Sequence, residues 1–161
     1  MGENWLIKYD FIYASVKNTE LFKKFYIELS NTDLCLKNYT TYGNKIKEYL
    51  NITNTNVSII DTLNIKNCLY VILCCIIRYI ELNKNKTIYE IYSESRNLFE
   101  KKNKDYGDAF MDYLSIGVLV RLGDKIKRTE NLIKKNNPNF ESIDDTLSDS
   151  FNYVILALIL L

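Results

Sequence analysis

Acidic side chains recur at helical spacing near the end of the sequence. Glu141, Asp145, Asp149 and Asn152 follow one another at intervals of four, four and three residues. On a helix these intervals place the four side chains within an arc of about 80°. Carboxylates one turn apart can converge on a hard cation, so this stripe is a candidate site for Mg²⁺.

A stack of acidic side chains needs a compensating positive charge, because like charges one turn apart repel one another. No Lys or Arg follows at helical spacing on this face of the same helix. The compensation must therefore come from a metal ion or from another helix. For Glu141 and Asp145 alone, a helix N-terminus is a simpler explanation, since negative charge is stabilising there. Asp149 and Asn152 lie beyond that first turn.

A second charged stripe precedes the first. Arg121, Asp124, Lys125 and Arg128 occupy positions i, i+3, i+4 and i+7 and share one helical face. One carboxylate among three cations suits a metal ligand surrounded by phosphate-binding groups. The alternative is a solvated face with local ion pairs.

Further polar residues lie around a break in the helical pattern at 103–107. Gly107 permits a sharp turn, Tyr106 could stack on a base, and lysines such as Lys104 could contact phosphates. Upstream, Glu90 and Glu94 lie one turn apart and could add a carboxylate to the site. An ordinary helix–helix turn and solvent-facing glutamates are the alternatives.

The elements that must position these residues are helices. Pro occurs once and Gly five times, while 47 % of the residues are hydrophobic. Such a composition disfavours a turn-rich β protein and predicts an all-α, compact bundle of about five or six helices. Apolar spacing and capping boxes at 58–61 and 87–90 place helices at about 15–29, 42–50, 63–82, 87–102, 108–135 and 140–161. Segment 51–57 is expected to be a loop, although 51–60 could hold a short strand.

Two of these helices are apolar on most faces. The 63–82 stretch is expected to be a buried central helix. The end of the chain, 153–161, has almost no polar residues and must be buried on every side. A second subunit would bury it most easily, so we expect a homo-oligomer, in the simplest case a dimer.

The composition also excludes several classes of chemistry. The chain has no His, which removes Ser–His and Cys–His nucleophiles and imidazole metal ligands. Its net charge of +1 gives no general reason for direct nucleic-acid or membrane binding. The four Cys lack C-x-x-C spacing and are expected to be buried thiols. The longest apolar runs, 68–77 and 154–161, are too short to span a bilayer, and without a signal-peptide pattern we expect a cytoplasmic protein.

Three blocks of sequence in the last third of the chain resemble a known family. They are 102–110 (KNKDYGDAF), 120–128 (VRLGDKIKR) and 141–149 (ESIDDTLSD) with the following 152–153 (NY). They resemble the nucleotide-modification-associated domain family, which is found largely in phages. That family is similar to the all-α nucleoside triphosphate pyrophosphatases of the MazG-like and dimeric dUTPase superfamily. The resemblance covers about residues 86–161, and residues 1–62 stand as an N-terminal extension to a nucleotide-site core at 63–161.

The resemblance implies a helical fold, usually dimeric, in which acidic residues hold Mg²⁺ (or Mn²⁺) against a nucleoside triphosphate. Water then attacks the α-phosphate and pyrophosphate leaves. Carried over residue by residue, the expected catalytic carboxylates are Glu141, Asp145 and Asp149, and Asp124 joins them as a metal ligand. Glu94, which comes from the helical spacing and not from the resemblance, is a further expected metal ligand. Expected nucleotide contacts are Arg121, Lys125, Arg128, Asn152, Lys104, Asp105 and Tyr106.

The leading hypothesis is therefore a Mg²⁺-dependent pyrophosphohydrolase acting on an unmodified or modified (deoxy)nucleoside triphosphate. The superfamily usually carries an E-x-x-E helix and an E-x-x-D helix. This chain has Glu90-x-x-x-Glu94 and Asp145-x-x-x-Asp149 instead. Two alternatives follow: a module that binds or sequesters nucleotides without turnover, and a viral helical interaction protein located in the host cytoplasm.

Overall fold

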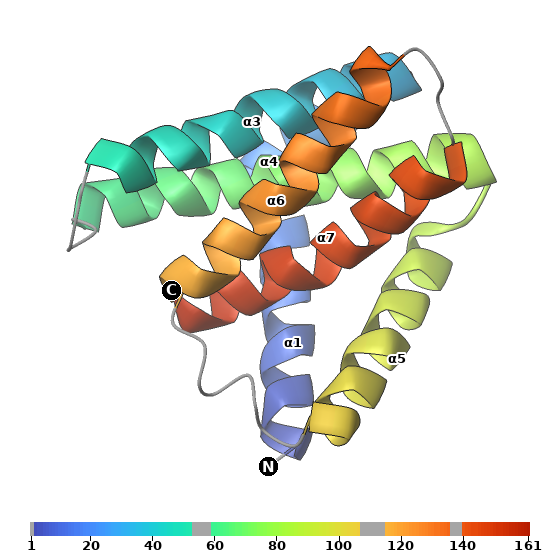
Figure 1. The fold of residues 1–161 in the computed structure, drawn as a ribbon. Helices are drawn as coiled ribbons and strands as arrows, with labels where there is room; N and C mark the ends of the chain where they lie inside the picture. Colours follow the sequence, from blue (N-terminus) through green and yellow to red (C-terminus); the bar gives the residue numbers. More distant parts are fainter. Residues whose placement is uncertain (1, 53–58, 107–114, 136–139) are drawn as a thin grey trace.

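The computed structural model describes residues 2–52, 59–106, 115–135 and 140–161. Seven α-helices and no strand occupy this described part of the chain (Figure 1), which confirms the all-α prediction with one helix more than expected. The helices are α1 (Gly2–Lys17), α2 (Glu20–Glu28), α3 (Thr32–Ile52), α4 (Ile59–Lys84), α5 (Ile88–Tyr106), α6 (Ser115–Lys134) and α7 (Phe140–Leu160).

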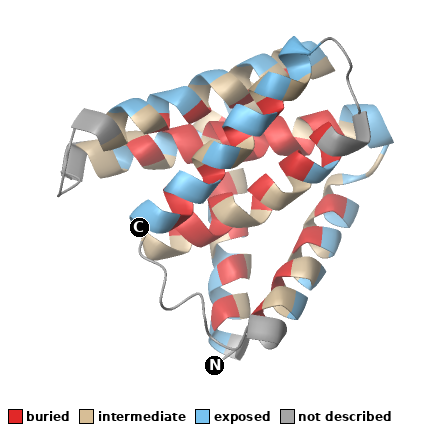
Figure 2. Cartoon of the chain, viewed as in Figure 1, coloured by how far each residue is buried: buried red, intermediate tan, exposed pale blue. Residues whose placement is uncertain are grey.

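Helix α4 lies at the centre of the fold, as its apolar sequence predicts. It packs against α2, α3, α5 and α7, and every residue from Val71 to Ile77 is buried (Figure 2). Helix α6 crosses α3 and packs along α7, while α1 packs against α5 and α7. Residues 2–52 therefore cover the later helices directly.

By length and composition, α4 is also able to cross a membrane, which the shorter apolar runs did not predict. The segment Asp61–Lys84 meets both criteria, but 67 % of its apolar window is buried inside the fold. A buried core helix passes the same test, and the packing of α4 accounts for its apolar character.

The first predicted helix, at 15–29, is wrong because it runs across a break. Helix α1 ends at Lys17, and Thr19 caps the start of α2. The hydroxyl oxygen of Thr19 accepts a hydrogen bond from the backbone N–H of Phe22 at 3.2 Å. Helix α1 was not predicted. Its signal is present, because Trp5, Tyr9 and Tyr13 recur every four residues and all three are buried.

Other boundaries differ less. Helix α3 begins ten residues before the predicted 42–50 helix, at Thr32, where the side-chain oxygen of Asn31 accepts from the N–H of Leu34 at 2.8 Å. The capping box at the start of α5 is confirmed: the N–H of Glu90 donates to the Thr87 hydroxyl at 3.2 Å, and Glu90 accepts from Thr87 in return. The capping residue Ser58, most of the expected 51–57 loop, and the 108–114 part of the predicted 108–135 helix lie outside the described residues.

The reason given for self-association is wrong. Residues Val154, Ile155, Leu156, Ala157 and Leu158 are all buried within this one chain, because α1, α4, α5 and α6 surround the end of α7. No second subunit is needed to cover them. A homo-oligomer stays a prediction, but the burial of the apolar end no longer supports it.

The four cysteines are free and buried, as predicted. Burial raises the pKa of Cys35 and Cys68 to about 11 and that of Cys74 to about 12. Burial likewise holds the pKa of Cys75 well above its ordinary value. The thiolate is the reactive form of cysteine, so these thiols are packing groups in the folded state.

A glycine lets α3 and α6 approach each other closely. A Cβ added to Gly43 would lie 2.2 Å from Cδ1 of Ile126 and 2.9 Å from its Cγ1 and Cγ2. Ile126 is buried, so its side chain has little room to move away. The crossing that brings α6, and with it the second charged stripe, over α3 therefore depends on the missing side chain.

We expect Gly43→Ala to lower the free energy of unfolding by about 1–3 kcal/mol, because the added methyl overpacks this crossing. Gly117→Ala is the matched control: it also lies within a helix, but a Cβ there would meet nothing within 4 Å. The control should gain about 0.5–1 kcal/mol from helix propensity. Urea denaturation of the two variants measures both values, and a stabilised Gly43→Ala protein would contradict the close approach.

A polar clasp joins α1 to α5. The guanidinium of Arg96 donates to both carboxylate oxygens of Asp10, at 2.8 and 3.1 Å, and the Tyr92 hydroxyl donates to the same carboxylate. Burial alone would raise the pKa of Asp10, but the hydrogen bonds from Arg96 and Tyr92 outweigh it and hold the pKa below its ordinary value of 3.8.

A lowered pKa in the folded state means that the clasp contributes stability above pH 3.8 and loses it as the pH falls through the native pKa. Asp10→Asn should therefore destabilise the protein by about 1 kcal/mol or less at pH 7, since the pair is partly exposed. The difference from the unsubstituted protein should shrink as the pH falls below 3.8. Denaturation curves at pH 7 and pH 3 test this, and a difference that is independent of pH would refute it.

Candidate functional site

A cavity of about 290 Å³ opens where the end of α4, the first part of α5 and the first part of α7 meet. Two of the predicted metal ligands, Glu94 on α5 and Asp145 on α7, line this cavity together. Asp145 is exposed and makes no ion pair with any residue that the structure describes. The helical spacing of α7 thus brings one predicted carboxylate to the same space as a carboxylate from another helix.

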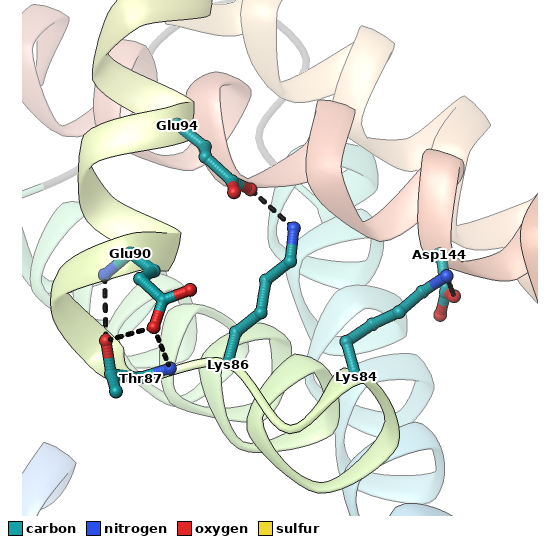
Figure 3. Close-up of polar contacts among 6 residues, drawn as sticks. All are labelled: Lys84, Lys86, Thr87, Glu90, Glu94 and Asp144. Carbon is teal, nitrogen blue, oxygen red and sulfur yellow. Dashed lines mark hydrogen bonds and ion pairs between the residues drawn. The ribbon is translucent and has the colours of Figure 1, made fainter.

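Two lysines at the cavity were missed in the sequence. The ammonium of Lys86 lies 2.7 Å from the carboxylate of Glu94, and the ammonium of Lys84 lies 3.1 Å from that of Asp144 (Figure 3). Asn83 also donates to both oxygens of Asp144, at 3.0 and 3.2 Å. Asp144 directly follows the buried Ile143 in the chain. The helical spacing of the sequence therefore does not indicate that this acidic residue is buried against the end of α4.

The chain reverses sharply between these lysines. Asn85 has a φ of 53°, in the left-handed region that asparagine tolerates better than most residues. This conformation follows the last residue of α4. As a result, Lys84 extends toward α7 while Lys86 extends toward α5, on either side of the loop (Figure 3).

The two ion pairs differ in exposure. The side chains of Lys86 and Glu94 are 34 % and 58 % exposed, and such surface pairs contribute about 0–1 kcal/mol to stability. Asp144 keeps only 9 % of its side chain exposed and has Asn83 as a second hydrogen-bond donor. Water can therefore replace Lys84 beside Asp144 far less easily than it can replace Lys86 beside Glu94.

Beyond the cavity, α7 carries its next carboxylate, Asp149. Lys125 of α6 lies 3.3 Å from this carboxylate, and Lys102 of α5 lies 3.9 Å from it. The positive charge beside Asp149 therefore comes from other helices, which is one of the two alternatives that the sequence left open. Lys125 was predicted as a phosphate contact, and Lys102 is one of the lysines before Gly107 that the sequence offered as possible phosphate contacts.

Asn152 holds three helices together. Its Oδ1 accepts a hydrogen bond from the Tyr9 hydroxyl of α1 at 2.7 Å, and its Nδ2 donates to the carbonyl oxygen of Ser95 on α5 at 3.1 Å. Both ends of the amide are thus occupied by the fold. Asn152 was predicted to support the carboxylates or the nucleotide, and in this structure it positions the helices that carry them.

The remaining predicted residues are placed as follows. Arg121, Asp124 and Arg128 are exposed on α6, while the buried face of that helix carries Leu119, Leu122 and Ile126, as predicted. The side chains of Lys104, Asp105, Tyr106 and Glu141 lie outside the described residues.

The side chains at the cavity are of the type that binds Mg²⁺, but they do not form a complete set of ligands. Carboxylate oxygens are the ligands this cation prefers. Among the described side chains, however, no three acidic groups lie close enough to share one ion. At the cavity Glu94 and Asp144 are each paired with lysine, and beyond it so is Asp149, which leaves Asp145 as the cavity carboxylate without an ion pair to a described residue. A metal site here needs at least one of these ion pairs to open.

The structural role of Asn152 can be tested by Asn152→Asp. The new carboxylate oxygen cannot donate to Ser95, so we expect a loss of about 1–3 kcal/mol in the free energy of unfolding. Asn97→Asp, at an exposed position on α5, serves as the control and should change stability by less than about 0.5 kcal/mol. Urea denaturation at pH 7 compares them. Equal effects would show that the amide of Asn152 is not holding the helices.

Comparison with known proteins finds a match to a family. Residues 102–161, which include the end of α5 and all of α6 and α7, match the model of a family described as nucleotide modification associated domain 1. No curated protein and no solved structure matches the chain. The matched segment carries Lys102, Lys125, Asp145 and Asp149, whereas Lys84, Lys86 and Glu94 lie before it. The last part of this chain is therefore similar to a nucleotide modification associated domain, which points to a nucleotide-related role.

Proposed function

We propose that the cavity between α5 and α7 binds the phosphates of a nucleoside triphosphate, and that the protein is a Mg²⁺-dependent pyrophosphohydrolase. The observation that carries this proposal is the meeting of Glu94, Asp145, Lys84 and Lys86 in one cavity. Carboxylates and ammonium groups together are what a metal–polyphosphate complex requires. The similarity of residues 102–161 to a nucleotide-related domain supports the same choice of ligand.

The reaction joins a water oxygen to the α-phosphorus and breaks the bond from that phosphorus to the bridging oxygen. A nucleoside monophosphate and pyrophosphate result. Asp145, Glu94 and Asp149, with Glu141, would hold Mg²⁺, which when bound supplies an activated water and neutralises phosphate charge. The chain's lysines offset the remaining negative charge. Asp145, unpaired in this structure, can accept a hydrogen bond from the attacking water and then its proton.

A second candidate is a module that binds nucleotides without hydrolysing them. It is favoured by the ion pairs themselves, because Glu94, Asp144 and Asp149 each have a lysine partner. No three described acidic groups converge. Such a protein would keep the phosphate contacts and lack the metal.

Other parts of the sequence-based hypothesis stay predictions. These are the kinship with MazG-like pyrophosphatases, a viral origin, a homodimer, and a location in the cytoplasm of a cell or host. The alternative of a helical interaction protein cannot use the apolar end of α7 as its partner surface, because most of that end is buried in the chain's own core.

The hydrolase is tested by measuring pyrophosphate release from a panel of ribo- and deoxynucleoside triphosphates with Mg²⁺. We expect release that EDTA abolishes and that Asp145→Asn lowers by about 100-fold or more, since a positioned carboxylate is worth that much in catalysis. Glu48→Gln removes an exposed carboxylate from α3, away from the cavity, and should keep full activity.

Two other outcomes are informative. If nucleotides raise the melting temperature but no substrate releases pyrophosphate, the binding module is the better description. If neither effect occurs with the folded protein, both nucleotide functions are wrong.

A further inference from the structure

The loop between α4 and α5 presents two ammonium groups to the cavity from outside the family-matched segment. Lys84 and Lys86 flank Asn85, whose left-handed backbone sends their side chains to different helices. Both lysines line the cavity, together with Glu94 and Asp145. The cationic wall of the site therefore comes from a part of the chain that the family match does not reach.

These two lysines are held very differently. The Lys84 ammonium lies against Asp144, a buried carboxylate that Asn83 also binds, so leaving it would strand a buried charge. The Lys86 ammonium lies against Glu94, whose carboxylate is more than half exposed and can be solvated by water once the lysine moves. Lys86 is the cation that can be exchanged.

The cavity is small for a whole nucleotide. Its volume of about 290 Å³ lies at the lower end of the range for ligand pockets, and charged and hydroxyl side chains line much of it. Such a space suits a chain of phosphate groups and leaves a base to contact other parts of the protein.

We infer that Lys86 exchanges partners: it neutralises Glu94 in the free protein, and a polyphosphate then takes its ammonium and releases the Glu94 carboxylate toward a divalent cation. This inference deepens the proposed function and rests on it for the identity of the ligand. Lys84 stays on Asp144 and adds a fixed positive field. The exchange makes polyphosphate and cation binding mutually favourable, because each draws one partner out of the same ion pair.

The exchange has a signature that a merely structural ion pair lacks. Removing the Lys86 charge should weaken the binding of the anion and strengthen the binding of the cation in the absence of anion. We would measure inorganic tripolyphosphate binding by calorimetry in EDTA, and Mn²⁺ binding without phosphate by electron paramagnetic resonance. Both are measured on the full chain, for the unsubstituted protein and for Lys86→Gln, Lys86→Arg and Lys101→Gln.

For Lys86→Gln we expect tripolyphosphate to bind about 5- to 10-fold more weakly, as for the loss of one charge-assisted contact. Mn²⁺ should bind several-fold more tightly, and adding Glu94→Gln should remove that gain. Lys86→Arg keeps the charge and should bind tripolyphosphate like the unsubstituted protein. Lys101→Gln removes an exposed lysine of α5 that does not line the cavity and should change neither affinity.

The inference is overturned if Lys86→Gln, folded by circular dichroism, binds both probes as the unsubstituted protein does, or if the latter binds neither. Its failure differs from failure of the proposed function. Pyrophosphate release that depends on Asp145 but not on Lys86 would remove only the exchange. The expected effects on tripolyphosphate and Mn²⁺, without any nucleotide hydrolysis, would remove only the hydrolase.

Discussion

The fold depends on the divided character of α7. Every residue from 154 to 158 in its second half is buried, while its first half keeps Asp145 exposed and Asp149 half-buried beside buried residues such as Leu147. Residues from Val154 to Leu158 are enclosed on every side, which is possible only where several helices surround them. That enclosure fixes the axis of α7 against α1, α4, α5 and α6. The acidic first half of α7 then lies beside the end of α4 and the first part of α5, and the cavity forms there.

Electrostatics follow from that placement. Carboxylates on one helix cannot be neutralised from within it when no cation shares their face, so α4, α5 and α6 each contribute a lysine. The pairs range from the enclosed Asp144 to the exposed Glu94, and their resistance to exchange falls in the same order. The charge that stabilises the fold, Asp144, therefore lies on α7, while the charge that a ligand can recruit, Glu94, faces it from α5.

The sequence could predict what is local. Thr87 and Glu90 form their capping box within one turn, and Leu119, Leu122 and Ile126 follow the period of a helix, so both were found. The break at Thr19 was missed because the apolar stripe continues past it. The Asp144 pairing was missed because it joins positions 61 residues apart, and only the packing of α4 against α7 brings them together. Asp145 and Glu94 were predicted by residue type, while their shared cavity depends on the same packing.

The hydrogen bonds of Asn152 with Tyr9 and Ser95 link the family-matched segment to the helices before it. The family-matched residues include α6 and α7 but not α1, α4 or most of α5, which also bury α7, and the ring centroid of Tyr9 lies 4.8 Å from that of Phe99. A fragment starting at residue 102 would expose the apolar half of α7 to water and lose its partner for Asn152. In this structure the buried surface of the matched segment is thus completed by helices that precede it in the chain.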